Sequence, residues 1–238
     1  MGRPRVLRPQ LRRDSLDSVA GAMLPPSAVK AFYDRFGARQ DKQAFYEDRA
    51  LDDLVTHAAL PSARHIVEFG CGTGRFAYRM LTAAPEARYT GCDVSTTMVA
   101  LSEHRLASFK DRVSVRAQPE GSVLLPAGPQ SADRLVSTYV LDLLPEAQIH
   151  TFLAEARRVL APGGRLCLVG ISPGFTVRSR VLMAGWAALW QVAPRIVGGC
   201  RPISVAAFVR GTDWTLEHVG RVDSWGVASE VVVATLPD

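Results

Sequence analysis

The stretch Glu68-Phe69-Gly70-Cys71-Gly72-Thr73-Gly74 decides the fold class of this 238-residue chain. A short apolar run, residues 65–69, leads into it, and residues 75–83 after it place apolar side chains at helical spacing. This pattern predicts a strand, a tight glycine loop and a helix. Such a loop brings backbone N–H groups and a helix N-terminus together where no Cβ obstructs a nucleotide-like ligand.

The spacing of the glycines distinguishes two kinds of ligand. A dinucleotide loop has two residues before its third glycine to hold a pyrophosphate, whereas Thr73 alone separates Gly72 from Gly74. The shorter loop favours a ligand without pyrophosphate and argues against a nucleotide-dependent oxidoreductase. Glu68 can supply a carboxylate to a cationic group of that ligand. Asp93, at the end of the next predicted strand, can accept hydrogen bonds from both hydroxyls of a ribose.

Strand-like and helix-like segments alternate along most of the chain. The further strand-like segments are residues 87–93, 113–115, 134–138, 165–171, 216–223 and 230–235. The further helix-like segments are residues 27–39, 41–60, 95–110 and 145–160. The alternation predicts an α/β fold: a doubly wound, Rossmann-like, seven-stranded and mostly parallel sheet with an antiparallel C-terminal hairpin. N-terminal helices and a helical insertion after the fifth strand, within residues 175–205, complete a single domain over residues 27–238.

Four runs of residues carry a resemblance to a known family. They are residues 67–76 with the glycine loop, 91–95 with Asp93, 136–141, and 158–164 with Pro162-Gly163-Gly164 at their end. Together they resemble the class I S-adenosylmethionine-dependent methyltransferases, and within these the small-molecule branch that contains the ubiquinone and menaquinone methyltransferases. The resemblance covers residues 31–171 well and the C-terminal hairpin in outline. It implies an enzyme that binds S-adenosylmethionine and transfers its methyl group.

The resemblance also implies a role for individual residues in binding the cofactor. Glu68 and the glycine loop would line the methionine part, and Asp93 the ribose. The residues after Asp93, together with Gln118, would meet the adenine. Tyr139 would border the methyl group, and Tyr33 would belong to a helical lid. The residues expected to bind the cofactor are Tyr33, Glu68, Gly70, Cys71, Gly72, Gly74, Asp93, Val94, Met98, Gln118 and Tyr139.

The catalytic residues are less well defined by the sequence. Methyl transfer from a sulfonium mainly requires alignment of nucleophile, methyl and leaving sulfur, so a dedicated base is optional. Asp142 and His150 follow the fourth strand and are candidates for a base that takes a proton from the acceptor. Each also has a structural explanation, Asp142 as a cap before Pro145 and His150 as an exposed helix position. The Asn/Asp-Pro-Pro-Tyr/Phe motif typical of amino-methyltransferases of DNA bases and protein glutamine is absent at residues 137–140.

The apolar segment 175–200 bears on the acceptor. It contains Trp186 and Trp190 and is flanked by arginines, but its longest apolar stretch is too short to span a bilayer. It suits a helical lid over an apolar substrate, core packing beneath such a lid, or a helix resting on a membrane surface. We therefore expect a small, partly apolar acceptor, lipid-, quinone- or secondary-metabolite-like, with transfer to oxygen, nitrogen or carbon left open. The alternative from another class is a non-catalytic, Rossmann-like scaffold for a protein partner.

The charge and the cysteine content indicate which binding partners and which cellular compartment to expect. The formal net charge is +5, and five arginines precede the first acidic residue, Asp14. The excess therefore lies within residues 1–26, which we expect to be a disordered basic tail, and nucleic-acid binding by the folded part is not expected. Four cysteines lie far apart without metal-ligand spacing, so neither a metal nor a disulfide framework is expected. The expected location is cytoplasmic, with peripheral membrane contact through residues 175–200 as an open alternative.

Overall fold

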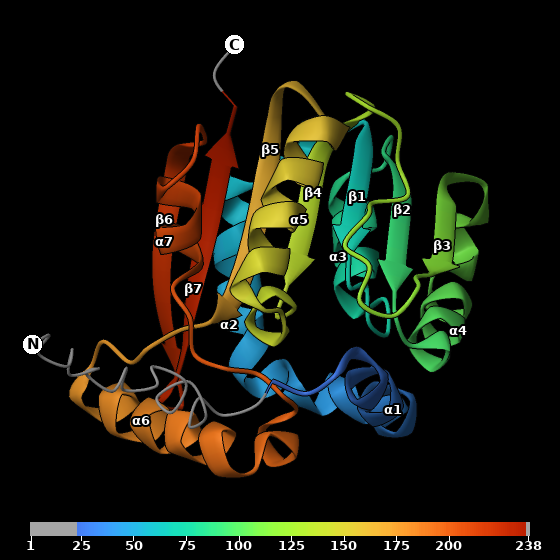
Figure 1. Cartoon of the computed structure of the whole chain (residues 1–238). Helices are drawn as coiled ribbons and strands as arrows, with labels where there is room; N and C mark the ends of the chain where they lie inside the picture. The colour runs from blue at the N-terminus through green and yellow to red at the C-terminus, as the bar shows by residue number, and fades with distance from the viewer. Residues whose placement is uncertain (1–22, 237–238) are drawn as a thin grey trace, which may run out of the picture.

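The computed structural model describes residues 23–236 and contains a seven-stranded sheet (Figure 1). The strands are β1 (His65–Phe69), β2 (Arg88–Asp93), β3 (Val113–Ala117), β4 (Ala132–Thr138), β5 (Leu160–Ile171), β6 (Thr215–Ser224) and β7 (Val227–Thr235). Their order in the sheet is β3-β2-β1-β4-β5-β7-β6. β1 to β5 pair in parallel, whereas β7 is antiparallel to β5 and β6 is antiparallel to β7. The predicted mostly parallel, seven-stranded sheet with an antiparallel C-terminal hairpin is confirmed.

Helices lie on both faces of the sheet. They are α1 (Pro26–Phe36), α2 (Ala44–His57), α3 (Arg75–Ala83), α4 (Thr96–Arg105), α5 (Glu146–Val159), α6 (Val177–Val192) and α7 (Val205–Arg210). Short 3-10 turns connect them: η1 (Gly37–Gln43), η2 (Leu60–Ser62), η3 (Ala107–Arg112), η4 (Leu141–Leu143) and η5 (Pro194–Val197). The helix predicted over residues 95–110 ends at Arg105 and continues as η3. Helix α7 was not predicted, because six residues are too few to show helical periodicity.

Alternate side chains of each central strand enter different layers of the core. Ile66 of β1 packs in a cluster with residues of α2 and α3, whereas its neighbour Val67 packs with residues of α5 and α7. All five residues of β1 are buried, as expected for a parallel strand that is covered on both faces. The result is a helix–sheet–helix sandwich, with α5 on the near face of the sheet and α2 and α3 behind it in Figure 1.

The N-terminal segment enters the structure where α1 begins. Residues 1–22 of the expected disordered tail lie outside the described residues. Pro26, the last residue of that expected tail, is the first residue of α1. An ideal Cβ on Gly199 would lie 3.2 Å from Cδ1 of Leu24, so Leu24 is in contact with the turn that follows α6.

Helix α6 is the predicted insertion after the fifth strand, and it crosses the end of the sheet beneath β5, β6 and β7 (Figure 1). A capping box formed by Thr176 and Ser179 begins it. Its inner face packs through Met183 and Trp186 in a cluster with Ile171. Within the described residues, no helix has the length and apolar character needed to cross a bilayer.

Candidate functional site

A cavity of about 180 Å³ opens at the carboxyl ends of β1, β2 and β4. This is the point at which strand order reverses, because β2 and β3 extend the sheet on one side of β1 and β4 on the other. Open α/β sheets bind ligands at this switch point. The lining residues are Leu24, Pro26, Val29, Tyr33, Gln40, Phe69, Gly70, Gly72, Asp93, Val94, Gln118, Pro119, Gly121, Ser122, Thr138, Tyr139, Val140, Leu143, Leu144, Pro145 and Gln148.

The first two glycines of the loop are required by its geometry. Gly70 and Gly72 have φ of +79° and +51°, which side-chain-bearing residues rarely adopt. A Cβ on Gly70 would stand 2.3 Å from Cγ2 of Val140, and one on Gly72 would stand 2.8 Å from Oε1 of Gln40. The N–H groups of Gly70 and Cys71 donate to the Cys92 carbonyl, so they hold the loop against β2 and are not free for a ligand.

Two residues expected to bind the cofactor do not reach the cavity. Gly74, at the N-cap of α3, has φ of +75°, and a Cβ there would lie 3.0 Å from Cα of Ser102. Its role is to let α3 pack against α4. Met98 is fully buried in α4, and its N–H donates to Oγ of the capping residue Ser95. Neither Gly74 nor Met98 lines either cavity, because both side-chain positions point into helix packing.

Asp93 is placed at the cavity by two backbone hydrogen bonds. Its Oδ2 accepts from the Gly72 N–H and its Oδ1 from the Ser95 N–H, each at 2.9 Å. Burial raises the pKa of this carboxyl, and those hydrogen bonds oppose the rise. Val94 and Gln118 also line the cavity, as the resemblance implied for the adenine end. The Gln118 amide donates to the Ser122 carbonyl at 2.7 Å and thereby closes the loop after β3.

Glu68 borders a second, smaller cavity of about 40 Å³ beside the first. Its Oε2 accepts a hydrogen bond of 2.5 Å from Oη of Tyr89, and burial raises the pKa of Glu68 to about 8. A Cβ on Gly91 would stand 2.5 Å from the same Oη, so that glycine makes room for the phenol. Sequence reasoning missed Tyr89. The signal available was a glycine two residues further along the strand, on the same face.

Two tyrosines line the main cavity from different elements. Tyr33 of α1 is there as expected of a lid helix, and its Oη lies 4.0 Å from Sγ of Cys200. Tyr139, just after β4, lines both cavities and has φ of +57°, a strained conformation for an aromatic residue. Its Oη lies 3.0 Å from Oγ of Ser229, which fixes the orientation of the ring.

Gln40 is a further residue of the site, and it was not among the residues expected from the sequence to bind the cofactor. It belongs to η1 and lines both cavities. Its Oε1 is buried, and among the described residues it has no hydrogen-bond partner. A buried acceptor without a donor is costly, so this oxygen suits a ligand that brings an N–H group.

The two candidate bases lie in different environments. His150 is exposed on α5, with its ring centroid 5.7 Å from that of Phe208, and it lines neither cavity. The position of His150 therefore does not support a base role for it. Asp142 is fully buried, and neither carboxylate oxygen has a hydrogen-bond partner in the described structure. It does not cap α5 either, since the N-cap is Pro145. Burial raises the pKa of Asp142 to about 7.

The segment 175–200 contributes no residue to either cavity. It supports the cavity wall from behind. A Cβ on Gly199 would lie 3.3 Å from Cδ2 of Leu143, and the indole N–H groups of Trp186 and Trp190 donate to the carbonyls of Cys200 and Gly199. Of the three explanations that the sequence allowed, packing behind the site describes the inner face of α6.

Comparisons with known proteins agree with this geometry. Residues 66–164 match the family described as the methyltransferase domain. The ubiquinone/menaquinone biosynthesis C-methyltransferase UbiE of Paracoccus denitrificans is 34% identical over 109 residues, covering 46% of this chain and 43% of that protein. The malonyl-[acyl-carrier protein] O-methyltransferase of Hahella chejuensis is 31% identical over 140 residues, covering 59% and 46%. The chain thus spans less than half the length of these two curated relatives.

A solved structure supports the fold over most of the chain. The N-methyltransferase NodS of Bradyrhizobium japonicum, in complex with S-adenosyl-L-homocysteine, aligns with a TM-score of 0.67 at 18% identity, over 88% of this chain and 99% of that one. Residues 66–164 of this chain therefore match a methyltransferase domain, and the likeness to NodS supports the Rossmann-like fold. The four sequence runs that resemble the class I methyltransferases all lie within the matched residues.

Proposed function

We propose that the protein transfers the methyl group of S-adenosylmethionine to a small, partly apolar acceptor, lipid-, quinone- or secondary-metabolite-like. The observation that carries the proposal is the composition of the main cavity. The glycine loop and Asp93 line this cavity together with the apolar side chains of Leu24, Val29, Val140, Leu143 and Leu144. Such a wall disfavours an acceptor whose polar groups would lie against it without partners.

The residues present fit the cofactor on two observations. Gly72 leaves a space that a Cβ would fill, and the unpartnered Oε1 of Gln40 borders that space. Asp93 would hold the ribose, and Gln40 and Glu68 would meet the cationic α-amino group. When bound, the cofactor supplies an electrophilic methyl group on a sulfonium.

The carboxyl groups at the two cavities favour a cationic ligand. Glu68 and Glu47 are buried and Asp93 is partly buried at the two cavities, and burial raises the pKa of Glu68 to about 8 and of Glu47 to about 7. An arriving cation favours the charged form of such carboxyls. A ligand with ammonium and sulfonium charges therefore gains from these groups, whereas a dinucleotide pyrophosphate would not.

The chain's own contribution to methyl transfer is alignment and exclusion of water. Tyr139 lines both cavities, so we assign it the position between the cofactor's methionine end and the acceptor. Its strained backbone is held in place by its N–H, which donates to the Val169 carbonyl at 2.7 Å. Any base for a phenolic or hydroxyl acceptor would be Asp142, one residue before the lining residue Leu143.

Calorimetry with S-adenosylmethionine and, separately, NADH tests the class of ligand. We expect saturable binding of S-adenosylmethionine that weakens by about 1–3 kcal/mol in Asp93→Ala, the scale for losing a good polar contact. Asp213→Ala, at an exposed ion pair with Arg157, is the matched control and should bind normally. Binding of NADH alone would overturn the proposal.

Methyl transfer to apolar acceptors tests the activity. Quinols, acyl carriers and phenols, offered with radiolabelled cofactor, should include at least one methylated acceptor. Cofactor binding without transfer to any acceptor, together with a stable protein complex, would support the competing scaffold function. The four cysteines are all buried and unpaired, which supports a reducing compartment such as the cytoplasm.

We further propose that the outer face of α6 rests on an anionic membrane surface. Val177, Val181, Val192, Ile196 and Trp225 are each more than two thirds exposed. Helical spacing places the three valines on one stripe of α6, and Ile196 follows in η5. The tip of the β6–β7 hairpin extends this stripe, because Arg178 of α6 donates a hydrogen bond to the Trp225 carbonyl at 3.1 Å.

The charge on this face favours lipid over a second copy of the chain. Arg178, Arg180 and Arg195 are exposed beside the stripe, and the sequence has no Asp or Glu between Glu155 and Asp213. A second copy would bring arginines against arginines, whereas lipid phosphates supply the missing negative charge.

Vesicle sedimentation tests the membrane proposal. We expect binding to vesicles with phosphatidylserine, weaker binding to phosphatidylcholine alone, and at least tenfold weaker binding by Val181→Glu/Val192→Glu. Leu124→Glu, at an exposed leucine on another loop, is the matched control. Unchanged binding by the double variant would assign the attraction to the basic N-terminal residues. A dimer that the double variant breaks would assign the face to a second copy.

A further inference from the structure

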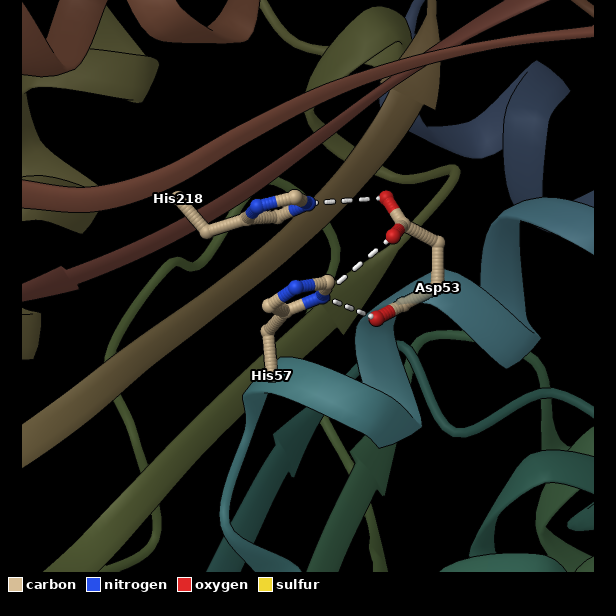
Figure 2. A group of neighbouring side chains, drawn as sticks. All are labelled: Asp53, His57 and His218. Carbon is tan, nitrogen blue, oxygen red and sulfur yellow. Dashed lines mark hydrogen bonds and ion pairs between the residues drawn. The ribbon is translucent and has the colours of Figure 1, made fainter.

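Three side chains from two distant segments meet on the outer surface of α2. Asp53 and His57 are one helical turn apart on α2, and His218 lies on the edge strand β6 (Figure 2). One ligand atom from each residue can be chosen so that all three lie within 4.8 Å of one another. All three side chains are partly exposed, with 24%, 39% and 22% of their surface accessible.

The geometry joins both imidazoles to one carboxylate. His218 Nε2 lies 2.9 Å from Asp53 Oδ2, and His57 Nδ1 lies 3.3 Å from Oδ1. The two rings stack with centroids 3.5 Å apart and planes 7° apart. Figure 2 shows both rings presenting a nitrogen to the same side, toward Asp53.

Two backbone features position these groups. The pairing of β6 with β7 shifts register between Leu216 and His218, and such an irregularity re-aims a side chain. Gly220 lies opposite the carboxylate, where a Cβ would stand 2.1 Å from Asp53 Oδ2 and 2.8 Å from His218 Nε2. The cluster therefore depends on a glycine at position 220.

Asp53 differs from its neighbours in the acidic row of α2. Glu47 and Asp48 pair with Arg75, and Asp52 pairs with Arg79. Among the described ion pairs, the partners of Asp53 are imidazoles and not arginines. An imidazole can bind a metal ion while an arginine cannot.

We propose that Asp53, His57 and His218 form a zinc site, with water completing a four-coordinate shell. Two imidazole nitrogens and one carboxylate oxygen are ligands that Zn²⁺ prefers. His57 Nδ1 also lies 2.8 Å from the Asp53 carbonyl, so this nitrogen gives up its proton and that hydrogen bond when it binds the ion, and the two rings tilt toward each other. None of the three residues lines a cavity. The ion therefore ties the sheet edge to α2 and takes no part in methyl transfer.

Zinc titration of the full chain tests the site. We expect one Zn²⁺ per chain, a higher melting temperature with zinc, and affinity at least about tenfold weaker in Asp53→Asn, His57→Ala and His218→Ala. The exposed histidines His104 and His150 provide matched controls, and their alanine variants should bind zinc normally. Binding of S-adenosylmethionine by each variant shows that it is folded.

Cobalt provides a second readout, because tetrahedral Co²⁺ absorbs visible light much more strongly than octahedral Co²⁺. We expect intense bands that zinc abolishes and that His218→Ala lacks. Zinc binding that survives all three substitutions, or the absence of saturable binding by the unmodified chain, would overturn the proposal. The cluster would then be a hydrogen-bonded triad.

Discussion

The side-chain oxygen of Gln40 lies 2.8 Å from the point at which a Cβ would stand on Gly72, and it is buried without a hydrogen-bond partner. The turn η1 carries Gln40, and the loop after β1 carries Gly72, so this contact joins the N-terminal helices to the glycine loop. The two residues enclose the space into which the cofactor's methionine end is proposed to fit.

Gly72→Ala is expected to weaken cofactor binding. The added Cβ would stand against Gln40 and would also need φ of +51°, so it costs both space and backbone strain. Gly163→Ala is the matched control, because Gly163 has φ of +70° with nothing near its Cβ position. Calorimetry should show normal cofactor binding by Gly163→Ala and at least about tenfold weaker binding by Gly72→Ala. Equal losses of affinity in the two variants would mean that backbone strain alone, and not the contact with Gln40, weakens binding.

Gln40→Leu is expected to lower the affinity for the cofactor without lowering the thermal stability of the protein. The substitution removes a buried oxygen that has no partner, so we expect unchanged or slightly higher thermal stability. It also removes the proposed acceptor for the cofactor's ammonium group, so affinity should fall by about 1–2 kcal/mol. Thermal melts and calorimetry on the same preparation measure both. A less stable variant that binds cofactor normally would contradict this assignment.

Cofactor binding at pH 7 is expected to release protons. Burial raises the pKa of Glu68 to about 8, so this carboxyl is largely protonated at pH 7, and a nearby cation would lower its pKa. Binding heats measured in buffers of different ionisation enthalpy should therefore differ, corresponding to up to about one proton. Glu68→Gln should reduce that difference. Equal heats in every buffer would show that the cation does not approach Glu68.

Asp142→Asn is expected to stabilise the protein at high pH. The carboxyl has an ordinary pKa of 3.8 when unfolded and, through burial, about 7 when folded. Between these values the unfolded state binds fewer protons, so the free energy of unfolding falls as pH rises from about 4 to about 7. Each pKa unit is about 1.4 kcal/mol, so at pH 8 the gain from removing the charge is on the order of a few kcal/mol.

Denaturant unfolding across this pH range measures the effect, with the exposed Asp213→Asn as control. Asp142→Asn should flatten the profile, whereas the control should not. A loss of methyl transfer in Asp142→Asn at unchanged cofactor affinity would additionally place this carboxyl in the chemistry of the acceptor.

Elements that depend on neighbouring residues were predictable. The glycine loop and the helix at residues 75–83 were each predicted from adjacent residues, and the structure has that helix as α3, directly after the loop. Local patterns specify these elements because backbone conformation and capping involve residues within one turn. Helix α7 was not predicted, because its six residues show no helical periodicity. Tertiary contacts help to hold it, and in one of them Glu230 accepts a hydrogen bond from the Ala206 N–H at 2.9 Å.

Among the residues that the resemblance implied for the site, Asp93 at the end of β2 and Tyr139 just after β4 line the main cavity, and so does Tyr33 of α1. Met98 and His150 lie on helices close to the site in sequence, yet their side chains point into packing and into solvent. Helix rotation relative to the sheet decides such directions, and it is set by the whole core.

The sequence by itself determined the class of fold, the glycine loop and the end of β2 where Asp93 stands, because these are local backbone features. Only the tertiary structure decided that Gln40 meets Gly72, that Asp142 is buried without a partner, and that His57 and His218 share Asp53. The last pair is 161 residues apart in the chain. Contacts at such separation depend on how helices and strands pack, and no spacing pattern in the sequence records that packing.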